Sequence, residues 1–156
     1  MRLITFQGTF RGTDSERGSN EIGSDLFFGA VEVEATADEQ LLFEYIIGWG
    51  EELRFEMQCF GVFLDDETFV MRGETKLFEG ASVTTDDLDA EKSFGNIQVK
   101  KDDSTAFILD TVSEEDSDDR IFINMTISNL DPANLPEAHR VPRTAPFRIK
   151  RQSWPC

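Results

Sequence analysis

The sequence has few of the residues that build metal or disulfide frameworks, with two cysteines and one histidine in 156 residues. Two cysteines, Cys59 and Cys156, do not make a disulfide framework, so a reducing compartment is the default expectation. Cys59 falls among alternating apolar residues and is predicted to be a buried, inert thiol. His139, with no cysteine cluster near it, gives no basis for a transition-metal site.

Basic residues are also scarce, with 15 Lys and Arg against 31 Asp and Glu and a net charge of −16. Contacts to nucleic-acid phosphates require Lys and Arg, so the composition argues against a nucleic-acid partner. An anionic membrane surface is disfavoured for the same reason. Cations and basic protein surfaces remain as partners, and the alternative is an acidic surface that only keeps the protein soluble.

Long apolar runs are missing as well. No stretch approaches the roughly eighteen apolar residues of a membrane-spanning helix. The first residues, MRLITFQGTFRG, lack the apolar core and cleavage site of a signal peptide. The sequence therefore predicts a cytoplasmic protein without a membrane-spanning segment.

Proline is absent before residue 132, and all five prolines lie in residues 131–156. Because proline disrupts the hydrogen-bond ladders of sheets, this division predicts a single all-β domain over 1–130 and a basic, proline-rich tail over 131–156. Within the tail, Phe147, Ile149 and Trp154 are candidate partner-binding residues. They could dock on the acidic rim of this chain that is described below, on a second copy or on another protein. Residues 147–149 could also add a short edge strand. The alternative is a loosely packed terminus.

The sequence does contain strong alternation of apolar and polar residues, which indicates β-strands. The clearest case is a long hairpin over 53–79, in which Phe55, Met57, Phe69 and Met71 are expected to form the core. Other strands are expected at 2–10, 26–35, 41–47, 95–101, 105–112 and 120–130. Residues 41–47 are apolar on both faces, so two turns of helix are the alternative there, although the aromatic and β-branched residues favour a strand. About eight strands with short connections predict an antiparallel sandwich or a closed barrel. A change of apolar face near Gly61 predicts a bend or corner there and favours the sandwich.

The expected connections gather at two ends of the fold if successive strands run up and down. Those at 11–25, 48–52, 80–94 and 113–119 then share one end. They hold fifteen acids against three basic residues, a charge of about −12. The sequence therefore predicts one strongly acidic rim.

Carboxylates from two of these connections are candidate calcium ligands, because calcium takes six to eight oxygens that neighbouring loops can supply. The candidate residues are Asp86, Asp87, Asp89, Glu91, Glu114, Asp116 and Asp118. Their spacing does not match an EF-hand loop. Acidic loops that bind nothing and are simply solvated are the alternative.

Two functional hypotheses follow. The favoured one is a non-enzymatic module that uses its acidic loop end to bind a divalent cation, calcium-like, or a basic protein surface. The other is a β-barrel enzyme or small-ligand carrier with Glu56, Arg72 and Glu74 in its interior. The sequence contains no glycine-rich phosphate loop and no linked nucleophile and base, so a catalytic role is the less favoured of the two.

Overall fold

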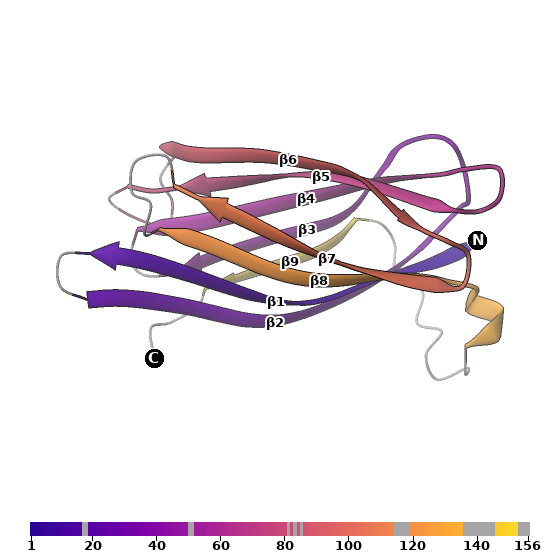
Figure 1. The fold of residues 1–156 in the computed structure, drawn as a ribbon, viewed down its shortest axis with the longest axis horizontal. Coiled ribbons are helices and arrows are strands. Elements are labelled where there is room, and N and C mark those ends of the chain that lie inside the picture. Colours follow the sequence, from indigo (N-terminus) through magenta and orange to yellow (C-terminus); the bar gives the residue numbers. More distant parts are fainter. Residues whose placement is uncertain are drawn as a thin grey trace.

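Two β-sheets pack face to face in the computed structural model, which describes residues 1–16, 19–49, 52–80, 82, 84, 86–113, 119–135 and 146–152 (Figure 1). The sheets are not closed into a barrel, so the structure confirms the all-β sandwich. Among the described residues, no helix has the length and apolar character needed to cross a membrane.

The first sheet has four antiparallel strands in the order β2-β1-β8-β7. Their bounds are Ser19–Val33 for β2, Arg2–Glu16 for β1, Arg120–Leu130 for β8 and Asp103–Val112 for β7. The second sheet has five strands in the order β6-β5-β4-β3-β9. Their bounds are Leu88–Val99 for β6, Phe69–Phe78 for β5, Leu53–Phe63 for β4, Gln40–Trp49 for β3 and Phe147–Gln152 for β9.

The loop expected over 11–25 is wrong, because β1 and β2 pair from Arg2↔Val33 to Glu16↔Ser19. Glycines gave this segment the appearance of a loop, but two of them make room for Trp49. A Cβ on Gly12 would lie 2.6 Å from Trp49 Cε2, and one on Gly23 would lie 2.7 Å from Trp49 Cβ. The indole therefore fills space that side chains would otherwise occupy.

The loop expected over 80–94 is also too long, because β6 begins at Leu88. Its first half is rich in acids, yet Ala90 is buried against the core and Glu91 lies opposite Lys76 on β5. Charged residues are accommodated on this edge strand because one of its sides faces water.

The expected edge strand in the tail is confirmed and is longer than residues 147–149. β9 runs parallel to β3, from Phe43↔Phe147 to Gly48↔Gln152. The Phe147 ring stacks on Phe43 with a centroid distance of 6.2 Å, and Ile149 is 7% exposed. Residues 147–152 thus complete the five-stranded sheet. A short 3-10 helix, Pro132–Asn134, follows β8.

The core lies between the sheets and is dominated by aromatic rings. Phe55, Met57, Phe69 and Met71 are all buried, as the hairpin pattern predicts. The bend expected at Gly61 is wrong: burial alternates without interruption along β4, and its register with β5 is continuous. The irregularity nearest to Gly61 lies in the neighbouring strand β3, between Leu41 and Phe43.

Gly61 is required for packing rather than for bending. A Cβ at this position would lie 2.1 Å from Cε2 of Phe69 and 3.0 Å from Cδ1 of Leu42. Both neighbours are buried, so neither can move into solvent. The missing side chain of Gly61 is the space that the Phe69 ring occupies.

Gly61→Ala should therefore lower the free energy of unfolding by about 2 kcal/mol, because overpacking a filled core forces rings from their preferred positions. Urea denaturation measures the change. Gly95→Ala is the control, since the nearest atom to its Cβ would be Arg72 Cβ at an ordinary 3.4 Å. Adding Phe69→Leu to Gly61→Ala should recover part of the loss. Additive effects of the two substitutions would contradict the proposed contact.

A buried arginine joins several strands at the end of the sandwich opposite the acidic rim. Arg2, 1% exposed, donates from Nε to Asn129 Oδ1 at 2.9 Å, and from Nη2 to the Asn129 carbonyl at 2.9 Å and to Asp102 Oδ1 at 2.8 Å. Asn129 Nδ2 in turn donates to the carbonyls of Glu67 at 2.9 Å and Val99 at 3.2 Å. This network ties β1 and β8 to the connections that follow β4 and β6.

Candidate functional site

The strand ends that were expected to share one end of the fold do so. β1, β3, β5 and β7 end there, and β2, β4, β6 and β8 begin there (Figure 1). Trp49 at the end of β3 packs on Gly12 and Gly23 of the other sheet, which places the ends of the two sheets together. The acidic connections of the two sheets therefore belong to one rim.

A surface hollow of about 510 Å³ lies on this rim, where β5 ends and β6 begins. A backbone hydrogen bond of 3.1 Å from Glu79 N to the Asp87 carbonyl closes the base of this connection. Five carboxylates line the hollow, which we call the acidic hollow: Glu52, Glu79, Asp86, Asp87 and Asp89.

Asp89 has the most unusual position of these acids. Both of its carboxylate oxygens are buried, and neither has a hydrogen-bond partner. The cause is a β-bulge: Leu88 pairs with Phe78 and Ala90 pairs with Leu77, so Asp89 is the extra residue between them. A bulge redirects the side chain of its extra residue, and here both carboxylate oxygens of that residue are buried where it lines the acidic hollow.

The structure places the predicted calcium ligands in different surroundings. Asp86, Asp87 and Asp89 all line the acidic hollow. Glu91 lies further along β6, where it pairs with Lys76 at 3.6 Å. Glu114, Asp116 and Asp118 lie outside the described residues. Across the part of the chain that is described, no three Asp, Glu, His or Cys side chains form a group able to hold a metal ion.

Two acids of the predicted rim, Asp25 and Asp86, have basic side chains close to them within the fold. Asp25 accepts a hydrogen bond from the Tyr45 hydroxyl at 2.9 Å and forms an ion pair with Arg151 of β9. Burial and the neighbouring Asp25 carboxylate raise the pKa of Tyr45 well above its ordinary value. Asp86 lies 3.8 Å from Arg54. The free negative charge of the rim is thus smaller than the sequence count.

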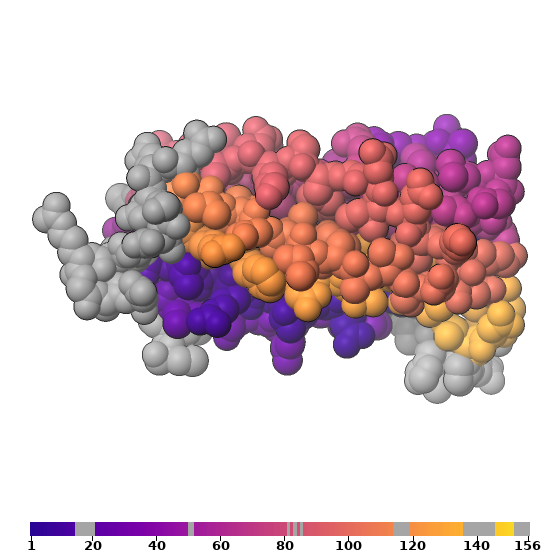
Figure 2. Space-filling view, viewed as in Figure 1, coloured from indigo at the N-terminus to yellow at the C-terminus, as the bar shows by residue number. Residues whose placement is uncertain are grey.

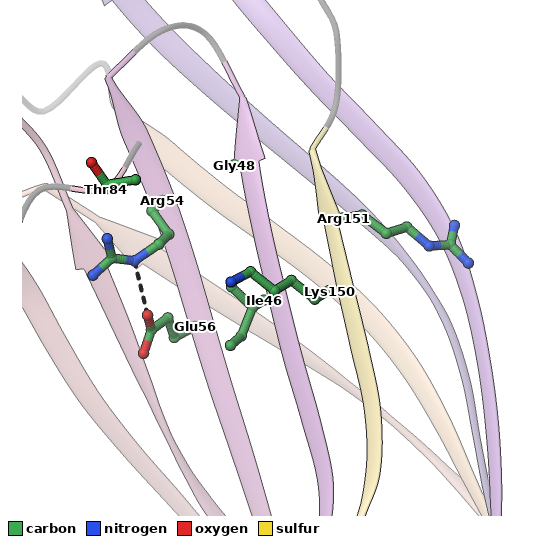
Figure 3. A pocket seen from close by; sticks show the side chains of 7 residues that line it. All are labelled: Ile46, Gly48, Arg54, Glu56, Thr84, Lys150 and Arg151. Atoms are coloured by element: carbon green, nitrogen blue, oxygen red, sulfur yellow. Dashed lines mark hydrogen bonds and ion pairs between the residues drawn. The ribbon is translucent and has the colours of Figure 1, made fainter. Parts of the chain in front are cut away.

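Beside the acidic hollow lies a second hollow of about 440 Å³, on the outer face of the five-stranded sheet. Figure 3 shows Arg54 joined to Glu56 at one side of it, and Arg151 directed away from them toward β2. The Arg54 guanidinium also stacks over the Phe78 ring at 4.2 Å. The contacts with Glu56 and Phe78 hold the Arg54 guanidinium, and its positive charge, between the two hollows.

The residues proposed for a barrel interior have no such interior, because the sheets do not close into a barrel. Glu56, Arg72 and Glu74 lie on the outer face of the five-stranded sheet, opposite the buried residues of β4 and β5. Arg72 pairs with Glu39 and covers the Phe60 ring at 4.9 Å. The prediction that these three side chains lie inside a barrel is therefore wrong.

The predicted partner-binding residues fall into two groups, buried residues and residues outside the described part of the chain. Phe147 and Ile149 pack against this chain's own core, and Trp154, like His139, lies outside the described residues.

Cys59 is fully buried, and burial raises the pKa of its thiol well above the ordinary value of 9.0. A thiol that stays protonated and enclosed is a poor nucleophile.

Sequence reasoning missed Glu52 and Glu79 as members of a shared site. Glu52 was counted with the rim, and Glu79 lies at the end of the predicted hairpin, so their proximity needed the strand order. Comparisons of this chain with protein-family models, with curated proteins and with solved structures find no match.

Proposed function

We propose that this chain is a binding module that engages a basic protein surface, with a Lys or Arg side chain of the partner entering the acidic hollow. The observation that carries the proposal is the Asp89 carboxylate, whose two buried oxygens have no hydrogen-bond donor. A buried carboxylate without a donor is costly, and an inserted guanidinium would supply two donors in the right geometry.

The charge of the whole chain supports the same partner class. A net charge of −16 steers basic surfaces toward it and repels acidic ones. A metal cation is the less favoured occupant of the acidic hollow. Calcium needs six to eight oxygens, and the described carboxylates do not form a group of three ligands.

Binding of a fluorescein-labelled hexa-arginine peptide, followed by anisotropy, tests the proposal. Asp89→Asn should weaken binding by about tenfold or more, because it removes a charge-assisted hydrogen-bond acceptor. Asp38→Asn is the matched control: it removes the same charge from an exposed site at the opposite end and should change binding less than about twofold. Equal effects of the two variants would reduce the interaction to nonspecific attraction.

Thermal melting with and without millimolar calcium separates the cation form. A rise in melting temperature that is lost in Asp89→Asn would replace the peptide by a metal ion as the occupant of the acidic hollow. Unchanged melting in calcium, together with selective loss of peptide binding, is the expected result.

A further inference from the structure

The outer face of the four-stranded sheet differs from the rest of this acidic surface. It is formed by the residues that point away from the core between 3–13 of β1, 22–32 of β2, 104–112 of β7 and 120–130 of β8. Its charged residues are two acids, Glu32 and Asp110, and two arginines, Arg11 and Arg120. The face is therefore neutral in a chain of net charge −16. We call it the neutral face.

Exposed apolar side chains are concentrated on the neutral face. Of the nine large apolar residues found exposed among the described residues, six lie here: Ile22, Leu26, Phe28, Ile108, Val112 and Phe122. Leu26, Thr9, Asn124 and Ile108 form one row across the four strands. Figure 2 shows β7 and β8 (orange) beside β1 (indigo) on the side turned to the viewer. A surface without net charge and with this apolar content is typical of an interface.

The outer face of the other sheet has a different character. Ion pairs cross it between Arg54 and Glu56, between Lys76 and Glu91, and between Arg148 and Glu44. Covering that face would take these ions out of water, which is unfavourable. The neutral face carries a single such pair, Arg120 with Asp110, in which Arg120 Nε donates to Asp110 Oδ1 at 2.6 Å.

We propose that the neutral face binds a second copy of this chain, forming a two-fold symmetric dimer. Two molecules of charge −16 repel each other, so they associate most readily through surface that has no excess of acids. The face is also self-complementary in charge. Arg11 and Glu32 have opposite signs, and neither forms an ion pair with another described residue.

The positions of Arg11 and Glu32 fit a two-fold axis that lies in the interface and runs across the strands. Glu32 is paired with Leu3, eight residues along β1 from Arg11, so the two charges are about 26 Å apart along the face. The axis reverses the strand direction of the second copy. It therefore brings Arg11 of each copy toward the Glu32 end of the other, and both charges gain a partner.

The size of the neutral face is sufficient for specific association. Four strands paired over the length from Leu3 to Thr13 span about 33 Å by about 19 Å, or about 600 Å² in each copy. A dimer would then bury about 1,200 Å², the lower end of the range for stable interfaces. We expect a dissociation constant in the micromolar range.

Sedimentation equilibrium of the full chain, from about 1 µM to about 500 µM at physiological salt, tests the dimer. Leu26→Asp should raise the dissociation constant about tenfold or more, because it puts a charge in the row that crosses the middle of the face. Leu64→Asp is the matched control: Leu64 is 49% exposed and lies beyond β4, outside the neutral face. A monomer at every concentration, or equal effects of both variants, would overturn the proposal.

Charge reversal tests the geometry separately. Arg11→Glu and Glu32→Arg change the net charge in opposite directions, yet each should weaken the dimer about tenfold, because each creates two like-charged contacts by symmetry. The double variant should restore dimerisation. Opposite effects of the two single variants would show a response to net charge alone and would overturn the two-fold arrangement. Circular dichroism confirms that each variant is folded.

Discussion

Ending the chain at residue 146 should lower the free energy of unfolding by about 5 kcal/mol, a large part of the total stability of a domain this size. The truncation removes β9, and with it the Phe147 ring from its stack on Phe43 and the buried Ile149 side chain. Loss of an aromatic and an aliphatic core side chain alone accounts for a cost of this size. The ion pairs of Arg148 with Glu44 and of Arg151 with Asp25 are lost as well.

Urea denaturation followed by circular dichroism measures this loss. A chain that ends at residue 152 is the control, because it retains all of β9. It should unfold close to the full-length midpoint. If the chain ending at residue 146 unfolds at the same urea concentration as the control, β9 does not contribute to the core and residues 131–156 are only an appended tail.

Arg2→Met should lower the free energy of unfolding by about 3 kcal/mol or more, because it leaves a buried acceptor without its donor and removes further hydrogen bonds of the network. Asn129 Oδ1 would lose its donor, and the Asn129 carbonyl would keep only the hydrogen bond from Asp102 N at 2.7 Å. Methionine keeps much of the volume, so the loss reports on hydrogen bonding rather than on a cavity. Arg120→Met is the control: Arg120 also pairs with an aspartate, but its side chain is 55% exposed, and the cost should stay below about 1 kcal/mol.

The acid dependence of this loss gives an independent check. The hydrogen bond from Arg2 holds the pKa of Asp102 below its ordinary value of 3.8. A carboxylate with a lowered pKa stabilises the fold fully above its ordinary pKa and loses that contribution as pH falls through the folded value. The difference in stability between the wild type and Arg2→Met should therefore shrink below about pH 4. A constant difference from neutral to acidic pH would contradict a role for Asp102.

The strands were predictable where alternation was strong, and the boundaries failed where residues served neighbours far away in sequence. Phe55 and Phe69 follow simple alternation, and both are core residues. Gly12 and Gly23 read as loop residues because their role depends on Trp49, which comes from the other sheet. Gly61 read as a bend because the ring that fills its space belongs to the next strand. Such steric complements are invisible until the strands are paired.

The candidate site, like the fold, was predictable from the sequence only in part. Up-and-down connectivity was enough to place the strand ends beside the acidic connections at one end, and Asp86, Asp87 and Asp89 of one connection line the acidic hollow. It could not show that, of these three, Asp89 has two buried oxygens without hydrogen-bond partners, because this follows from a one-residue bulge in β6. The charge of the rim counted from the sequence was also too negative, because Asp25 forms an ion pair with Arg151, which belongs to the segment that was expected to be a tail.

The pairing of β9 with β3 also has a consequence for the order of folding. Arg148 and Glu44 are 104 residues apart, whereas the hairpins of β1 with β2 and of β4 with β5 close over short turns. Closing a long loop is slow relative to forming local hairpins. We expect a refolding intermediate in which the local hairpins have formed, while the two long-range pairings, β1 with β8 and β3 with β9, have not, so that β3 is still an open edge. Its open backbone could pair with another chain, so refolding yield should fall as protein concentration rises.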